Sequence, residues 1–507
     1  MSFVTCFYER NAYSPVLINC QVSPLWASWS AFGGPKEALL RLTGSPNNLF
    51  ELANFLRIPV EIKDQQDDNV WWGYVDTITI HYEGSIISLT LDDLFNKVKV
   101  VYSFISPDNK LADQLETAYA EDTASQAEYG TKELIIQKFN LDQDFAEHFR
   151  DTFLATHATP QHILSQQEES PRTFAELHCS GWFSTLAWKS YDTAAGFYAN
   201  YGPGPGSFAY GNAANRIYPA QSFTTVGSSA LKYAYFMLRK FGTPSGNSYV
   251  SLLSDAAGSP SALVANSANV SEATIADTGY SWYAYEFSTP VALTAATRYW
   301  IALIHNAVSA AHYLSVRLDE NMSLIGEQGK YYNGAAWVNL PTVTNPGGVP
   351  DLYFRAVCVS DTGLQIGTIA TAAMQFSAGV QTISSGINAC PYRDNSRSAL
   401  EEILELMQLG TSNDRLILAN VLPNVYLLDF YEQPDPNTPT VFMDQQGRFF
   451  DHSAQPIKPY KPPVGEFAYF LGSNHFSQPF DKARVPACFV GHALFDFKTG
   501  KLSINPG

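Results

Sequence analysis

The residues of this chain best suited to ligand chemistry are aromatic residues beside a predicted turn. Tyr332 precedes Asn333-Gly334, a dipeptide that strongly favours a tight hairpin turn, and Trp337 follows it. A flat aromatic ring at the edge of a β-sandwich can stack on a sugar ring. We therefore predict glycan contacts at Tyr332 and Trp337, with Phe208 and Tyr210 as secondary candidates. The alternative is a hairpin tip that packs on a neighbouring subunit.

The chain lacks the motifs of common enzyme classes. It contains no H-E-x-x-H, no G-x-S-x-G and no P-loop, and its ten histidines have no paired ligand spacing. Asn140, Asp142 and Asp144 alternate like the start of a calcium loop, but Phe145 stands where such a loop needs glycine. Helix capping by Asp142 is the better interpretation. The sequence thus predicts no catalytic residue, no metal site and no cofactor, and a secreted carbohydrate-active enzyme is the disfavoured alternative.

Composition narrows the classes of partner. The 507 residues carry a formal net charge of −17 with only 31 Lys and Arg, which argues against stable nucleic-acid binding because such binding needs clustered cations. Six cysteines lie far apart without a C-x-x-C pair, so free thiols are expected. The sequence predicts neither a signal peptide nor a membrane span, because no apolar run approaches about 18 residues.

The patterning of the first third predicts β-domains with packed helices. Residues 1–107 alternate like half-buried strands, and helices are expected at PKEALLRLTG (35–44) and after Asp142. Residues 88–102 also resemble residues 176–191 when Leu89 is aligned with Leu177. This internal similarity predicts a duplication into related domains at 1–107 and 108–192, although any strand followed by a turn and a short helix would align comparably.

An insertion is predicted between residues 193 and 360. Seven or eight short strands with frequent turns indicate a two-sheet sandwich of jelly-roll type. SYDT at 190–193 before this block resembles VSDTG at 359–363 after it, so its removal would rejoin a continuous host chain. Within it, Tyr299, Ile301 and Leu303 alternate with Trp300 and Ala302, and most of these side chains are expected to fill the core of the sandwich.

The remainder, 361–507, is predicted to form further domains of the host. Ser398 and Glu401 form a capping box for a helix at 396–410, and Gly410 is placed to end it. A β-hairpin is expected at 415–434, followed by short strands and proline-rich turns up to the last residue.

Three segments resemble tail hub proteins of long-tailed bacteriophages and phage-like particles: YGTKELIIQKF (129–139), ELHCSGWFSTLAWKSYD (176–192) and the stretch 391–434. The resemblance covers roughly 1–192 and 361–450. It implies a virion structural protein that caps the tail tube at the tail tip or baseplate, without enzymatic activity, assembled in the bacterial host cytoplasm. Implied partners are the tail tube or distal tail ring, the tape measure and tip or fibre proteins. A hexameric distal tail protein is the alternative.

The inserted block resembles carbohydrate-binding-like sandwich modules, through AQSFTT, GNSYVSLLSDAAGSPSALVA and PVALTAATRYWIAL. This resemblance implies an outward-facing, adhesive module that contacts a host surface glycan. The predicted fold class is mainly β and multidomain, with tandem tail-tube-like β-barrel domains, packed helices and an inserted jelly-roll β-sandwich. Because two tube-like domains per chain would match a sixfold tube with three copies, we predict a homotrimer.

Overall fold

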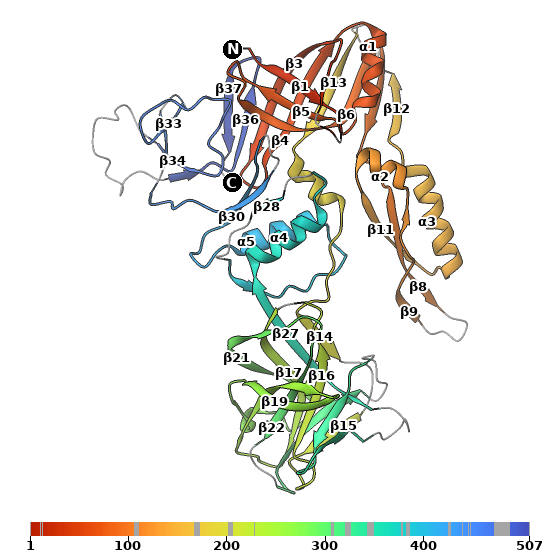
Figure 1. Cartoon of the computed structure of the whole chain (residues 1–507), viewed down its shortest axis with the longest axis vertical. Coiled ribbons are helices and arrows are strands. Elements are labelled where there is room, and N and C mark those ends of the chain that lie inside the picture. Colours follow the sequence, from red (N-terminus) through yellow and green to blue (C-terminus); the bar gives the residue numbers. More distant parts are fainter. Residues whose placement is uncertain are drawn as a thin grey trace. The chain divides into compact units, whose positions relative to one another are not determined.

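The computed structural model divides the chain into two compact units, each of which is built mainly of strands (Figure 1). Unit 1 comprises Met1–Tyr191, Thr362–Ile387 and Asn395–Gly507, and unit 2 comprises Asp192–Asp361 and Asn388–Asp394. Strands account for 51% of the chain and helices for 15%, which confirms the mainly β, multidomain prediction. The structure describes all residues except 1, 11, 13, 106–110, 167–172, 201–205, 228, 306–308, 320–325, 342–348, 377–378, 382–385, 424–426, 439, 445, 447, 471–486 and 506–507.

An antiparallel sheet of eleven strands forms the centre of unit 1. Its main path runs β2-β1-β5-β6-β13-β4-β3-β36-β37, and β7 and β12 continue it from one side of β6. A short helix, α1 (Pro46–Glu51), and a 3-10 turn, η1 (Leu52–Phe55), connect β4 to β5. The strands are β1 (Val4–Tyr8), β2 (Pro15–Val16), β3 (Gln21–Ser30), β4 (Gly34–Thr43), β5 (Pro59–Lys63), β6 (Asn69–Tyr82), β7 (Ser85–Thr90), β12 (Gln161–Gln166), β13 (Phe174–Ser180), β36 (His492–Asp496) and β37 (Lys501–Asn505).

The segment 35–44, predicted as a helix, is strand β4. Ala38, Leu40 and Leu42 are buried, whereas Glu37 and Arg41 are exposed, so burial follows a period of two. β3 and β13 hydrogen-bond to β4 from its two sides. Sheet pairing therefore outweighs the helix propensity of the leucine-rich sequence.

The predicted division into domains at 1–107 and 108–192 is wrong. β13, from the second range, lies between β6 and β4, which both belong to the first. Leu89 and Leu177 both pair with Ile78, because β7 and β13 flank β6 in one sheet. The similarity thus marks two neighbours of one strand rather than two copies of a domain. Among the described residues no sheet closes on itself, so the predicted tandem barrels are open sheets.

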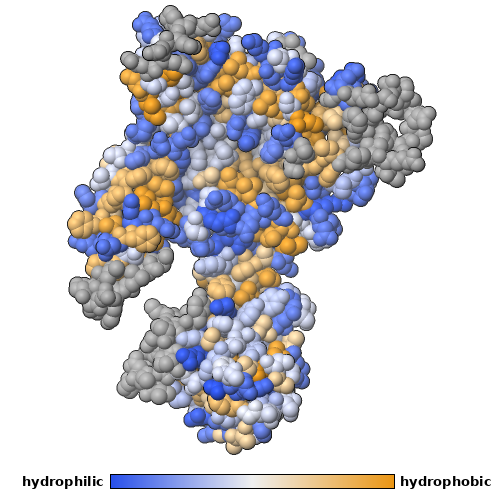
Figure 2. Space-filling view, turned by 180° about the vertical axis from the view of Figure 1, so that it is seen from behind, coloured by the Kyte–Doolittle hydropathy of each residue, from blue (hydrophilic) through white to orange (hydrophobic). Residues whose placement is uncertain are grey.

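A four-stranded sheet with one helix packed on it lies between β7 and β12 in the sequence. The helix begins at the Asp142 cap, as predicted, and its Phe149 packs on the sheet, but Phe145 is 65% exposed. Phe139 at the end of β11 is 79% exposed, and this part of the chain shows a hydrophobic surface in Figure 2. The elements are β8 (Lys97–Ile105), β9 (Leu111–Glu116), β10 (Ala120–Glu121), α2 (Thr123–Tyr129), β11 (Glu133–Phe139) and α3 (Gln143–His157).

The rest of unit 1 confirms the predicted helix and hairpin. In α5 the Ser398 side chain accepts from the Glu401 amide while the Glu401 carboxylate accepts from the Ser398 amide, and Gly410 follows with a φ of 76°. β30 pairs antiparallel with β31, and part of the predicted turn at 422–424 lies outside the described residues. The elements are η2 (Trp182–Trp188), α4 (Thr362–Ala373), β28 (Val380–Gln381), α5 (Ala399–Leu409), β30 (Ile417–Val421), β31 (Leu428–Glu432), β32 (Val441–Met443), β33 (Phe449–Asp451), β34 (Phe467–Phe470) and β35 (Ala487–Phe489).

Unit 2 is a sandwich of two sheets around one hydrophobic core. The eight-stranded sheet contains β14 (Phe197–Asn200), β15 (Gly206–Tyr210), β17 (Ser229–Phe241), β21 (Ser281–Leu293), β23 (Tyr313–Asp319), β26 (Asp351–Leu352), β27 (Phe354–Asp361) and β29 (Asn388–Ala389). The seven-stranded sheet contains β16 (Tyr218–Thr224), β18 (Asn247–Ala256), β19 (Ser259–Asn266), β20 (Val270–Ser271), β22 (Arg298–His305), β24 (Gly329–Tyr332) and β25 (Trp337–Asn339). A 3-10 turn, η3 (Glu272–Thr274), follows β20.

The strands at the start and the end of the range 192–361, β14 and β27, are neighbours in one sheet. β14 pairs antiparallel with β27 in the register Phe197↔Val357, and the amide of Cys358 donates to the carbonyl of Gly196 at 2.7 Å. The chain therefore enters and leaves the sandwich on adjacent strands, as an inserted domain requires. Residues 388–394 also belong to unit 2, because β29 pairs with the end of β27.

Candidate functional site

Phe208 and Tyr210 do not form a glycan site, because both belong to the core of the sandwich. Phe208 is 2% exposed and Tyr210 is fully buried. On β15 the buried positions alternate with Ser207 and Ala209, so the two aromatic side chains share the inner face of their sheet. Their prediction as surface residues failed because the preceding glycine- and proline-rich stretch resembles a surface loop.

Tyr332 and Trp337 do lie together on the surface of unit 2. They are the cross-strand partners that flank the turn 333–336, and their ring centroids are 5.5 Å apart. The side-chain oxygen of Asn333 accepts from two amides of the turn, and Gly334 adopts a φ of 95°, which favours glycine. Both aromatic side chains are half-buried, and Trp337 also packs against the cluster formed by Trp300, Ala220, Leu253 and Ala302.

Two further tyrosines extend this pair into a row across the sheet. Tyr218 pairs with Tyr332, and their rings are nearly parallel, with centroids 6.3 Å apart. Tyr249 pairs with Ile304, and the register of β16 with β22 places Tyr218 opposite Ile304. Burial and the neighbouring phenols of Tyr249 and Tyr332 raise the pKa of Tyr218. We call Tyr249, Ile304, Tyr218, Tyr332 and Trp337 the aromatic row.

The aromatic row lies on the outer face of the seven-stranded sheet. Ile304 and Trp337 pack against a small cluster that includes Trp300 and Ala302, whereas Tyr299, Ile301 and Leu303 belong to the core between the sheets. The predicted alternation along β22 is therefore correct. All four aromatic members of the row are half-buried, so each presents part of its ring to solvent.

Two charged side chains near Trp300, Asp255 and Lys330, are bonded within the protein. Asp255 accepts from the indole nitrogen of Trp300 at 2.7 Å and from the amide of Gly258 at 3.1 Å. The Lys330 ammonium donates to the Ser259 hydroxyl at 2.7 Å and lies 5.6 Å from the centre of the Trp300 ring. These contacts hold the Trp300 side chain fully buried beneath the outer face.

Sequence reasoning missed Tyr218 and Tyr249. Each occupies an outward position of an alternating strand, since Pro219 and Val250 beside them are buried. That alternation was visible in the sequence. What assembles the row is the register between five strands, and apart from the β24–β25 hairpin the neighbouring strands are far apart in sequence.

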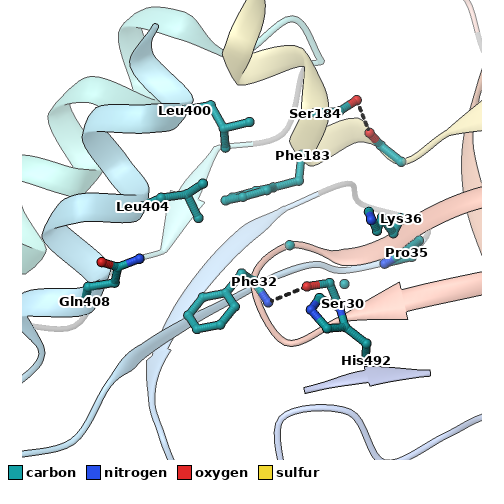
Figure 3. A pocket seen from close by; sticks show the side chains of 13 residues that line it. Ser30, Phe32, Pro35, Lys36, Phe183, Ser184, Leu400, Leu404, Gln408 and His492 are labelled. Atoms are coloured by element: carbon teal, nitrogen blue, oxygen red, sulfur yellow. Dashed lines mark hydrogen bonds between the residues drawn. The ribbon is translucent and has the colours of Figure 1, made fainter. Parts of the chain in front are cut away.

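Unit 1 contains a separate apolar pocket of about 360 Å³ (Figure 3). Leu400 and Leu404 of α5 point toward Phe183 of η2, and Phe32 closes the side formed by the β3–β4 turn. Gly33 is required at that turn, because a Cβ atom there would lie 2.5 Å from the Phe183 ring. The pocket has the size of a small-ligand site, but the α5 residues that line it, Leu400 and Leu404, lie beside the buried face of that helix and are only half-buried, and we assign no ligand to it.

Two titratable groups of unit 1 with shifted pKa values, Asp76 and Lys132, interact with each other and with Asp92. Burial, together with the nearby Asp92, raises the pKa of Asp76 to about 6. Burial lowers the pKa of Lys132, whose ammonium donates to the carbonyls of Leu91 at 2.5 Å and Asp92 at 2.9 Å. These bonds tie β11 to the segment between β7 and β8. Among the described residues, no three His, Cys, Asp or Glu side chains gather as a metal site, and no described helix has the length and apolarity to cross a bilayer.

The comparisons with known proteins provide no family for this chain. No family model matches it, and no curated protein matches it. Among solved structures, the clostridial cysteine protease Cwp84 aligns with 56% of this chain and 71% of its own, at 10% identity and a TM-score of 0.25. The mosquito-larvicidal Cry4Aa toxin from Bacillus thuringiensis aligns with 58% of this chain and 51% of its own, at 8% identity and a TM-score of 0.16. Similarities this low do not define a common fold.

Proposed function

We propose that this chain is a structural protein of a phage tail tip, of the hub type, whose inserted sandwich binds a glycan on the host surface. The proposal of a hub rests on the resemblance of the segments within 1–192 and 391–434. The proposal of adhesion rests on one structural observation, the aromatic row on the outer face of unit 2. Half-buried rings held by cross-strand pairing are rigid, and rigid rings lose little entropy when a sugar stacks on them.

The different architectures of the two units support this proposal. Unit 1 is built around one large antiparallel sheet of eleven strands, which suits a subunit that packs against others in a particle. Unit 2 is joined to it through adjacent strands, so an adhesive module can be carried without interrupting the host sheet. The row belongs entirely to unit 2, and a ligand can therefore be recognised by this unit alone.

A glycan array probed with the full-length protein tests the adhesive role. We expect binding to one or more surface glycans, and we expect Trp337→Ala and Tyr332→Ala to reduce it at least about tenfold. Tyr235→Ala is the matched control, because Tyr235 is a half-buried tyrosine on β17, in the other sheet. If the control loses binding and the two row variants keep it, the site lies on the eight-stranded sheet, and our proposal is contradicted. A protein that binds no glycan would contradict adhesion through sugars.

Copy number tests the hub assignment separately. The duplication from which three copies were predicted is not present in the fold, so the homotrimer has lost that support and stays a prediction. Native mass spectrometry of tail-tip subcomplexes should find three copies of this chain. Six copies at equivalent positions would favour the distal tail ring and would contradict the hub assignment.

A further inference from the structure

The aromatic row is a line of side chains that crosses five strands, β18, β22, β16, β24 and β25, at right angles to their direction. Neighbouring strands lie about 4.8 Å apart, so the row is roughly 19 Å long. A sugar unit of an extended β-linked chain advances by about the same distance as one strand spacing, so the row has room for four to five sugar rings, about one per strand. Because the strand spacing matches the advance per sugar unit, the number of strands in the row sets the number of sugar units that it can contact.

On one side of the row, the surface offers no further aromatic ring at the neighbouring outward positions. Two residues away from the row on each strand, the outward positions are Ser251, Ala302, Ala220, Lys330 and Asn339. None of these five residues carries an aromatic ring, and Ala220 and Ala302 are fully buried. A chain that ran parallel to the strands would leave the aromatic residues after one sugar. Only a chain laid across the strands meets the successive rings.

The row also carries no formal charge. Its members are three tyrosines, an isoleucine and a tryptophan, and Lys330, the next outward residue to Tyr332 on β24, is engaged by the Ser259 hydroxyl. A charged sugar would therefore lose hydration without gaining an ionic partner from these residues. This favours an uncharged ligand.

Building on the proposed function, we infer that the aromatic row binds an extended, uncharged glycan lengthwise across the strands. The continuous part runs from Trp337 through Tyr332 to Tyr218, where each ring is adjacent to the next. Ile304 then interrupts the aromatic surface, and Tyr249 provides a separate contact at the far end. Short oligomers bind at the Trp337 end, and longer oligomers gain affinity when they reach Tyr249.

Calorimetric titration of the full-length protein with β-1,4-linked glucose and N-acetylglucosamine oligomers of two to six units tests this inference. A β-1,4-linked oligomer of uronic acids serves as the charged probe. We expect affinity to rise with length up to about five units and then to level off, with the charged series weaker. Tyr249→Ala should lower the affinity of the longest oligomer about tenfold without changing that of the shortest, whereas Trp337→Ala should weaken both.

The outcomes separate this inference from the adhesive function on which it rests. Equal affinity for the shortest and longest oligomers, or tighter binding of the charged series, would overturn lengthwise recognition while leaving glycan binding intact. If the dependence of affinity on oligomer length is unchanged in Tyr249→Ala, the ligand does not contact the Tyr249 end of the row. If none of these oligomers binds and a glycan array also stays empty, the adhesive function itself fails, and the inference fails with it. Tyr235→Ala should leave the whole profile unchanged.

Discussion

Nδ1 of His305 lies 2.5 Å from Oε1 of Glu272, and both side chains are fully buried in unit 2. Glu272 begins η3 and His305 ends β22, so their contact fixes this turn to the seven-stranded sheet. We predict that Glu272→Gln lowers the free energy of unfolding by roughly 2 kcal/mol, because the buried hydrogen bond to His305 loses its carboxylate acceptor and keeps only a weaker amide one. Denaturant unfolding followed by the fluorescence of the tryptophans checks this value.

The matched control is the pair Lys232–Glu286, which is also in unit 2 but has a half-exposed carboxylate. Glu286→Gln should change the free energy of unfolding by less than about 1 kcal/mol, as solvent-exposed ion pairs usually do. Equal losses for Glu272→Gln and Glu286→Gln would show that the buried pair has no special weight in the sandwich.

Tyr210 offers a second test of the core. Its hydroxyl has no hydrogen-bond partner within the described part of the chain, and burial, with Tyr285 and Glu272 nearby, raises its pKa well above the ordinary value. We predict that Tyr210→Phe leaves stability unchanged or raises it by up to about 1 kcal/mol, since an unsatisfied buried hydroxyl is removed. Glycan binding should be unaffected. Thermal unfolding and the array measure both effects, and a destabilised variant would reveal a partner for this hydroxyl.

Asp76 makes the stability of unit 1 depend on pH. Its pKa is raised to about 6 by burial and by Asp92, whereas an unfolded aspartate titrates near 4. The folded state therefore holds the proton more tightly, so this contribution is full below about pH 4 and is lost as the pH rises through 6. The loss amounts to roughly 3 kcal/mol.

Asp76→Asn cannot ionise and should lack this dependence. Urea unfolding of unit 1 at pH values from 4 to 7 should show the unmodified protein losing stability relative to the variant as the pH rises. Parallel profiles for the two proteins would mean that the Asp76 carboxyl titrates normally in the folded state. Lys132 is left unchanged in this comparison, because its charge also acts on Asp76.

Local sequence signals predicted local structure well. The Ser398–Glu401 capping box and Gly410 marked the ends of α5, and Asn333-Gly334 marked the hairpin turn beside Trp337. In each of these the determining contacts join residues only three or four positions apart. The segment 35–44 was misassigned because its leucines allow either a helical or an alternating pattern, and only its pairing with β3 and β13 decides between them.

The register between strands that are far apart in the chain could not be predicted from the sequence. Leu89 and Leu177 have similar surroundings because each pairs with Ile78, and nothing in the sequence distinguishes this from a duplicated domain. The candidate site shows the same limit. Tyr332 and Trp337 could be found because one turn joins them, whereas Tyr249 reaches the row through the intervening strands.

The insertion itself gives the last prediction. Because β14 and β27 are adjacent, a variant that lacks 192–361 and joins Tyr191 to Thr362 through a short Gly-Ser linker should remain soluble and keep the unfolding transition of unit 1. Its segment 388–394 loses its partner strand β27, so a second variant with this segment shortened controls for the exposed edge. Both should assemble into tails that no longer adsorb to the host. If both variants are insoluble or block tail assembly, unit 1 requires the sandwich to fold, and the sandwich is not an independent insertion.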